Sequence, residues 1–288
     1  MIGIRLLAPT VAALVLVPAL GQGGPDPALA ILSRRLVVER AAAADAALAA
    51  LERAIAPAVE AARQGTAMIV SGAGAPGPQL RIAATDLAAA EVAAADADAA
   101  VDALEGARRA ADIGSSIEMA APPGEVASIA AQLDGAAPVA DAFADMRGRA
   151  ESLVASLERS LVALEEGSFD EARDLVARAR ADHDALAAWE VELVTLPVWI
   201  ETTDAMIGAV ETIIEATEAG DEAAALEAAS AFAGLAEEAA PADRALRIAI
   251  GEGGSAVTAA PMSRLADLLR AVAETRLEVA SILRTVGG

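Results

Sequence analysis

The chain has 288 residues, of which 81 are alanine, and its 43 acidic and 21 basic side chains give a formal net charge of −22. It has no Lys. The absence of Cys excludes disulfides and thiolate metal sites, and the absence of Asn excludes N-glycosylation. The single histidine, His183, excludes a metal site that needs two histidines of one chain. The negative charge opposes binding to nucleic acids and anionic lipid surfaces, and an aromatic content of 2% is too low for a base-stacking surface.

Residues 1–21 have the layout of a secretory signal peptide. Arg5 precedes an apolar run at residues 6–17, and small residues stand before a possible cleavage site at Gln22. The run is shorter than the ~20 residues that a membrane-spanning helix needs. We therefore expect an exported protein, located in the periplasm, at the cell surface or in the extracellular medium. An uncleaved N-terminal anchor is the alternative.

The first testable prediction concerns this processing. The mature protein is expected to begin at or near Gln22, because the apolar run and the small residues before that position suit cleavage by a signal peptidase. Mass spectrometry of the protein isolated from its native host measures the terminus directly. An intact Met1 in the soluble fraction is the opposite result.

Residues 22–112 are predicted to form an alanine-rich antiparallel hairpin of two helices. Asp26 and Pro27 suit the N-cap and the first turn of the first helix, which ends before the glycine-rich segment at residues 71–78. In the second helix, apolar residues recur every seven positions in two series, as in the a/d seam of a coiled coil. The two series are Leu80, Leu87, Ala94 and Val101, and Ala83, Ala90, Ala97, Leu104 and Ala111. A seam made mostly of alanine lets two helix axes approach closely.

Residues 113–137 are predicted to be a linker with one short helix that ends at Gly135, and residues 138–288 are predicted to form a helical bundle. No segment alternates apolar and polar residues with the period of a strand. The predicted fold class is therefore all-α without a sheet. It consists of seven to nine helices arranged as an antiparallel bundle or as elongated helical hairpins.

Local signals divide the predicted bundle further. Ser168 and Glu171 have the spacing of a capping box, and Asp221 follows Gly220 as the N-cap of another helix. Pro197 is expected to interrupt a helix that reaches about Leu196. Residues 251–254, which include three glycines, are expected to form a loop before the last helix.

Trp189, Pro197 and Trp199 are the binding-site candidates of the sequence. A proline inside a helix frees a backbone carbonyl, and the two indole rings on either side of it in the sequence could line an apolar pocket. Packing of both rings in the core is the alternative.

The other polar clusters predict no chemistry. His183 lies between two aspartates, but consecutive residues of a helix point about 100° apart and do not converge on a metal ion. The acidic cluster at residues 96–102 lacks the glycine and the final glutamate of a calcium-binding loop. No metal site, cofactor or catalytic residue is predicted.

The sequence thus favours an exported, non-enzymatic helical scaffold or interaction protein. The alternative is an extracytoplasmic helical bundle that binds a small ligand in a pocket near Trp189 and Trp199. The expected partner is a protein or a small apolar molecule and not a nucleic acid, and no segment after the leader is expected to span a membrane.

Overall fold

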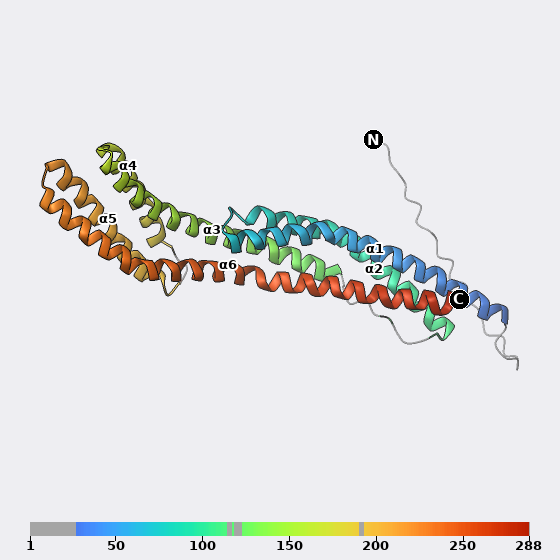
Figure 1. Cartoon of the computed structure of the whole chain (residues 1–288). Coiled ribbons are helices and arrows are strands. Elements are labelled where there is room, and N and C mark those ends of the chain that lie inside the picture. Colours follow the sequence, from blue (N-terminus) through green and yellow to red (C-terminus); the bar gives the residue numbers. More distant parts are fainter. Residues whose placement is uncertain (1–26, 114–116, 118–122, 190–192, 288) are drawn as a thin grey trace, which may run out of the picture.

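The structure is a computed structural model that describes residues 27–113, 117, 123–189 and 193–287. The predicted signal peptide at residues 1–21 lies outside these residues. The described residues form six helices and no strand, and Figure 1 shows that the helices build an elongated body. The helices are α1 (Pro27–Ser71), α2 (Gly77–Ala111), α3 (Pro123–Glu165), α4 (Phe169–Ala187), α5 (Leu196–Ala219) and α6 (Glu222–Gly287).

The all-α class is confirmed, but the expectation of seven to nine helices is wrong because two long helices continue through residues that were expected to end them. The short helix predicted in the linker and the helix predicted from Pro138 are both parts of α3. Likewise, α6 continues through Pro241, residues 251–254 and Pro261. An internal proline costs one backbone hydrogen bond, but buried residues on both sides of each proline hold the helix in place.

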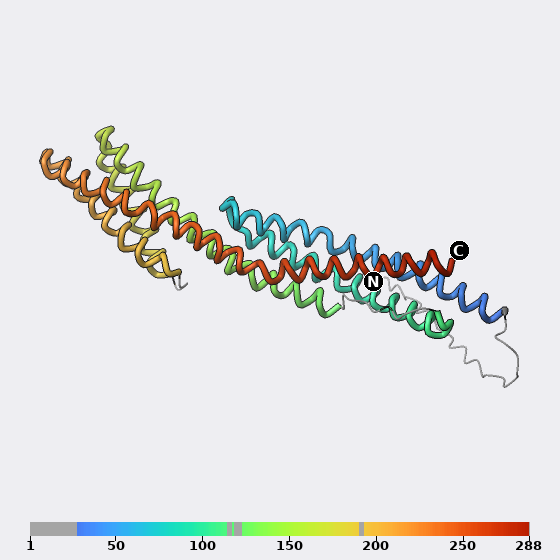
Figure 2. Tube along the Cα trace, turned by 60° about the horizontal axis from the view of Figure 1, so that its bottom comes forward, coloured from blue at the N-terminus to red at the C-terminus, as the bar shows by residue number. Residues whose placement is uncertain are grey.

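The buried apolar residues form two clusters that lie one after the other along the body. The first cluster joins α1 and α2 to the beginning of α3 and the end of α6. The second joins α4 and α5 to the rest of α3 and to the first part of α6. Figure 2 shows α6 running from the end formed by α4 and α5 to the end formed by α1 and α2. The division of the chain at residues 112 and 137 stays a prediction.

The predicted hairpin is present, with α1 and α2 packed antiparallel on either side of a short connection at residues 72–76. Every residue of the predicted seam is buried except Ala111, which is partly buried. The facing side of α1 contributes larger residues to the same cluster, among them Leu48, Leu51 and Ile55. Alanines and larger residues of both helices thus belong to one cluster, which fills the space between two closely packed helices.

The glycines predicted to form a loop instead allow helices to approach closely. A Cβ atom on Gly253 would lie 2.7 Å from the ring of Phe143 on α3, and one on Gly254 would lie 2.8 Å from Cγ2 of Ile69 on α1. At Gly251, one turn earlier on α6, a Cβ atom would meet nothing within 4 Å. The loop prediction is therefore wrong, because two of these glycines are needed where α6 passes α3 and α1.

This contrast gives a second prediction. Gly251→Ala should raise the free energy of unfolding by about 0.5–1 kcal/mol, since alanine is the better helix former and the site is open. Gly253→Ala and Gly254→Ala should each lower the free energy of unfolding by about 1 kcal/mol, because the strain of overpacking exceeds the gain in helix propensity. Urea unfolding of the three variants measures these changes. Equal effects at all three positions would mean that the contact with Phe143 and Ile69 is loose.

The capping predictions have mixed outcomes. Asp221 caps α6 as expected, because its Oδ1 accepts a hydrogen bond from the backbone N–H of Ala224 at 3.0 Å. Ser168 precedes α4, but its side chain makes no capping hydrogen bond, so the predicted capping box does not form. The turn before it relies on Gly167, whose φ of 76° lies in the left-handed region.

Candidate functional site

Pro197 does not interrupt a helix, as the sequence predicted, but lies in the first turn of one. The preceding helix α4 ends at Ala187, and α5 begins at Leu196. The N–H groups of the first turn of a helix have no carbonyl partner within the helix. A proline there costs no hydrogen bond, so proline is favoured at this position. Pro197 therefore leaves no helix carbonyl without a hydrogen-bond partner, as a proline in the interior of a helix would.

Trp189 and Pro197 line one cavity of about 630 Å³ at the junction of α4 and α5. Trp189 is partly buried, and its Nε1 has no hydrogen-bond partner among the described residues. One carboxylate, that of Glu201, also lines the cavity. The remaining described lining residues are apolar: Ala187, Leu193, Val194, Leu196 and Ile200.

Trp199 lies apart from the other two candidates. Its side chain is 1% exposed and belongs to the second hydrophobic cluster, as the alternative interpretation of the sequence expected. It also lines a different cavity, of about 230 Å³, between α3, α5 and α6. The structure thus brings Trp189 and Pro197 together and places Trp199 beside a separate cavity.

Two residues that line the cavity beside Trp199 each have a buried polar atom without a hydrogen-bond partner in the described part of the chain. These atoms are Nε1 of Trp199, a donor, and Oδ1 of Asp243, an acceptor. The other oxygen of Asp243 accepts a hydrogen bond from Nε of Arg247 at 2.7 Å. The sequence analysis missed Asp243, because a single carboxylate among 43 acidic residues carries no signal of its own.

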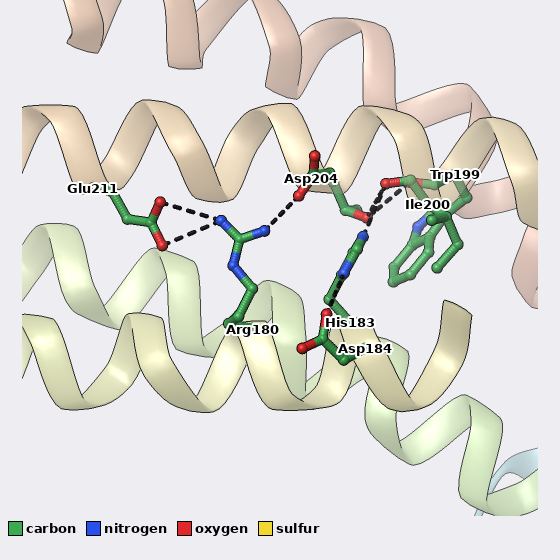
Figure 3. A network of polar contacts seen from close by, with 8 residues as sticks. Arg180, His183, Asp184, Trp199, Ile200, Asp204 and Glu211 are labelled. Atoms are coloured by element: carbon green, nitrogen blue, oxygen red, sulfur yellow. Dashed lines mark hydrogen bonds and ion pairs between the residues drawn. The ribbon is translucent and has the colours of Figure 1, made fainter. Parts of the chain in front are cut away.

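His183 connects α4 to α5 and is 7% exposed. Its Nε2 donates to the backbone oxygen of Ile200 at 3.2 Å, and its Nδ1 lies 3.3 Å from Oδ1 of Asp184. Both contacts are drawn in Figure 3. Asp182, the other neighbour in the sequence, pairs with Arg149 on α3 instead. The two aspartates therefore do not converge on the ring, and His183 is a packed side chain between two helices.

Arg180 forms a second polar link between the same helices, one turn earlier on α4. Its guanidinium group binds Asp204 and donates to both carboxylate oxygens of Glu211 at 3.1 and 3.2 Å (Figure 3). Burial by itself lowers the pKa of Arg180, but the hydrogen bonds and charges of Glu211 and Asp204 outweigh it, so the net pKa is raised. These links fix the pairing of α4 and α5.

Other candidate chemistry is limited in the described part of the chain. No three His, Cys, Asp or Glu side chains there are arranged to hold a metal ion. In the acidic cluster of α2, Asp96 and Asp102 are exposed and Asp98 is partly buried, which fits an outer helix face in solvent. None of the described helices contains a stretch apolar and long enough to cross a membrane.

Comparison with known proteins does not assign the fold or the site. The sequence matches no family model, and searches of curated proteins and of solved structures find no match.

Proposed function

We propose that this protein is an exported, non-enzymatic helical scaffold that holds interaction surfaces apart. The observation that carries the proposal is the continuity of α6, which has 66 residues and takes part in both hydrophobic clusters. At 1.5 Å per residue such a helix is about 100 Å long. A single helix of this length keeps the two ends of the body at a fixed separation, which is what a spacer requires.

Contacts at the junction of the two clusters support a rigid body. Asp141 on α3 accepts a hydrogen bond from the backbone N–H of Gly77 at 2.6 Å and pairs with Arg81 at 3.1 Å. Four residues after Phe143, Arg147 donates to the backbone oxygen of Ile69 at 3.3 Å. The end of the α1–α2 hairpin is thus tied to the middle of α3. Bending at this point would break several hydrogen bonds at once.

Site-specific photo-crosslinking in the native host tests this proposal. The probe is placed at Ile31 near the start of α1, at Leu226 near the start of α6, and at Val92 in the middle of α2. These side chains are 67%, 74% and 70% exposed. The first parts of α1 and α6, which carry the first two, lie toward opposite ends of the body (Figure 1). A scaffold should form defined cross-links at Ile31 and Leu226, to different partners. The absence of cross-links at both ends, or the same pattern at all three positions, would contradict the proposal.

A second candidate function is the binding of a small ligand at the cavity of Trp189 and Pro197. Its volume of about 630 Å³ is within the ~300–1,000 Å³ range of ligand pockets, and its walls are mostly apolar. Fluorescence of Trp189 in a Trp199→Phe background, titrated with naphthalene, tests it. Saturable quenching that Ala187→Phe abolishes supports a ligand site. Quenching that is equal in the presence of Ala187→Phe contradicts it.

A further inference from the structure

We propose that copies of this protein associate end to end, with the start of α1 of one copy docked in an apolar groove at the opposite end of the next copy. The first surface is the α1 tip, residues 27–40. The second is the end groove between α3, α5 and α6, whose apolar walls are Leu161, Leu164, Ile213, Ala225, Ala229 and Phe232. Each copy then contacts one neighbour through its tip and another through its groove. The inference goes beyond the scaffold function and does not depend on it.

The α1 tip exposes large apolar side chains. Leu29, Leu32 and Leu36 occupy the i, i+3 and i+7 positions of one helix face, and they are 46%, 61% and 43% exposed. The end of α6 lies beside Val38, since a Cβ atom on Gly287 would be 3.9 Å from Cγ2 of that residue. The part of α1 before Val38 therefore extends past α6, as Figure 1 shows. A helix face with anchors at this spacing is the kind that docks into an apolar groove.

The α1 tip is positively charged, although the whole chain has a net charge of −22. It carries Arg34, Arg35 and Arg40 and a single carboxylate, Glu39. Arg35 and Glu39 form an ion pair at 3.0 Å, but their side chains are 76% and 59% exposed, so water screens the pair and it is easily exchanged for another partner. Arg34 and Arg40 are exposed as well. The tip thus combines an apolar face with a local positive charge.

The end groove lies at the other end of the body, near the turns that join α3 to α4 and α5 to α6 (Figure 1). Its volume is about 410 Å³, more than twice the ~150 Å³ of a cavity that holds benzene in another protein. Leu161, Leu164 and Phe232 are only partly buried in its walls. Ala225 and Ala229, one turn apart on α6, are too small to fill the space. The groove therefore has room for apolar side chains of a docked helix.

The segments beside the end groove are acidic. Residues 165–171 and 215–222 contain eight carboxylates and no arginine. Glu165 lines the groove itself. Arg173 on α4 pairs with two of the eight carboxylates, so a net negative charge remains. This charge is complementary to that of the α1 tip and attracts its arginines.

Charge also determines which ends meet. Two α1 tips in contact would bring arginines together, and two end grooves would bring carboxylates together, which is unfavourable in both cases. Contact between unlike ends also keeps the acidic bodies apart, because α6 alone is about 100 Å long and charges interact over only ~10 Å at 0.1 M salt. Since the two surfaces differ and face opposite ends, association continues from copy to copy and gives chains.

Sedimentation equilibrium of the mature chain, residues 22–288, tests the association at ~0.1 M salt. One short helical segment in a groove makes a small and weak interface, so chain concentrations up to about 1 mM are required. The average mass is expected to rise with concentration beyond the mass of a dimer. An average mass that stays at one chain, or that stops rising at two chains, would overturn the proposal.

Two variants each block one surface. Leu32→Glu places a carboxylate in the apolar face of the α1 tip, and Ala229→Glu places one in the end groove. Both residues are exposed, so the fold should be retained, and the melting temperature of each variant verifies this. Each variant alone should have the mass of one chain. An equimolar mixture should form dimers and no larger species, because the intact tip of one variant fits the intact groove of the other.

Val92→Glu is the matched control, because Val92 is 70% exposed in the middle of α2, away from both surfaces. This variant should associate as the parent protein does. A mixture of Leu32→Glu and Ala229→Glu that stays monomeric would overturn the proposal. So would undiminished association of either folded variant alone, or an equal loss of association in Val92→Glu.

Discussion

Leu87→Ala is expected to lower the free energy of unfolding by about 2–5 kcal/mol, the range for truncation of a buried leucine. Leu87 is 0% exposed and lies in the seam between α2 and α1. Its neighbours along the seam, Ala83 and Ala90, are too small to fill the space that truncation leaves. Denaturant unfolding followed by circular dichroism measures the loss.

Substitutions at Ala94 and Ala95 test whether the same seam is closely packed. Ala94 is 0% exposed in the seam, while Ala95, the next residue, is exposed to solvent. Ala94→Leu should cost about 1–3 kcal/mol, because a tight helix contact has no room for the larger side chain. Ala95→Leu should stay within about 0.5 kcal/mol of the parent protein, since the two residues differ little in helix propensity. A neutral or stabilising Ala94→Leu would mean that the helices are loosely packed.

The seam could be predicted from the sequence because its information is periodic. Residues seven apart, such as Leu80 and Leu87, must lie on one side of a helix whatever the rest of the chain does. Helix ends could not be predicted as well, because the rules for Pro and Gly consider only the local backbone. Pro138 costs α3 one hydrogen bond, but Ala136, Ala137 and Ala140 around it are buried against other helices. That packing involves segments far apart in the sequence, so rules that consider only the local preferences of Pro and Gly cannot predict it.

The candidate site was predicted in part for a related reason. Pro197 and Trp199 are close in sequence, but two residues on a helix point about 200° apart. Pro197 therefore faces the cavity of Trp189, whereas Trp199 faces α3 and α6. Asp243 reaches the cavity of Trp199 from a helix far along the chain, and only the tertiary packing of α6 brings the two together. The sequence could indicate the tryptophans but not how the helices would separate them.

Glu105→Ala is expected to cost about 3–5 kcal/mol, the range for breaking a buried ion pair by removing one partner. Glu105 accepts hydrogen bonds from the backbone N–H of Ile117 at 3.0 Å and from Nε of Arg109 at 2.9 Å, and it pairs with Arg108 at 3.4 Å. Arg108 is only 5% exposed, so the substitution leaves a buried charge without its partner. Glu91→Ala, an exposed position on the same helix, is the control and should stay within about 0.5 kcal/mol.

A double variant separates the stabilisation that the Glu105–Arg108 ion pair provides from the destabilisation that an unpaired buried charge causes. Replacing both residues, as in Glu105→Met with Arg108→Met, removes the buried charges together. The double variant should therefore be more stable than Glu105→Ala, because paired apolar replacements of buried ions are often neutral or stabilising. Unfolding by urea compares the three proteins. A double variant that is less stable than the single one would show that Arg108 has another role in this part of the fold.

The same network predicts a dependence of stability on pH. The hydrogen bond from Ile117 has the largest effect, and together with Arg109 and Arg108 it lowers the pKa of Glu105 from its ordinary value of 4.5, although burial opposes the change. Because the folded pKa lies below the unfolded one, the stabilisation is fully present above about pH 4.5 and is lost as the pH falls through the folded value.

Glu105→Gln keeps the size of the side chain and lacks the charge. Its stability deficit relative to the parent protein should be constant near neutral pH and should shrink below pH 4.5. Urea unfolding of both proteins between pH 7 and pH 3 measures the deficit. A deficit that does not change with pH would mean that Glu105 stabilises the fold through its shape alone.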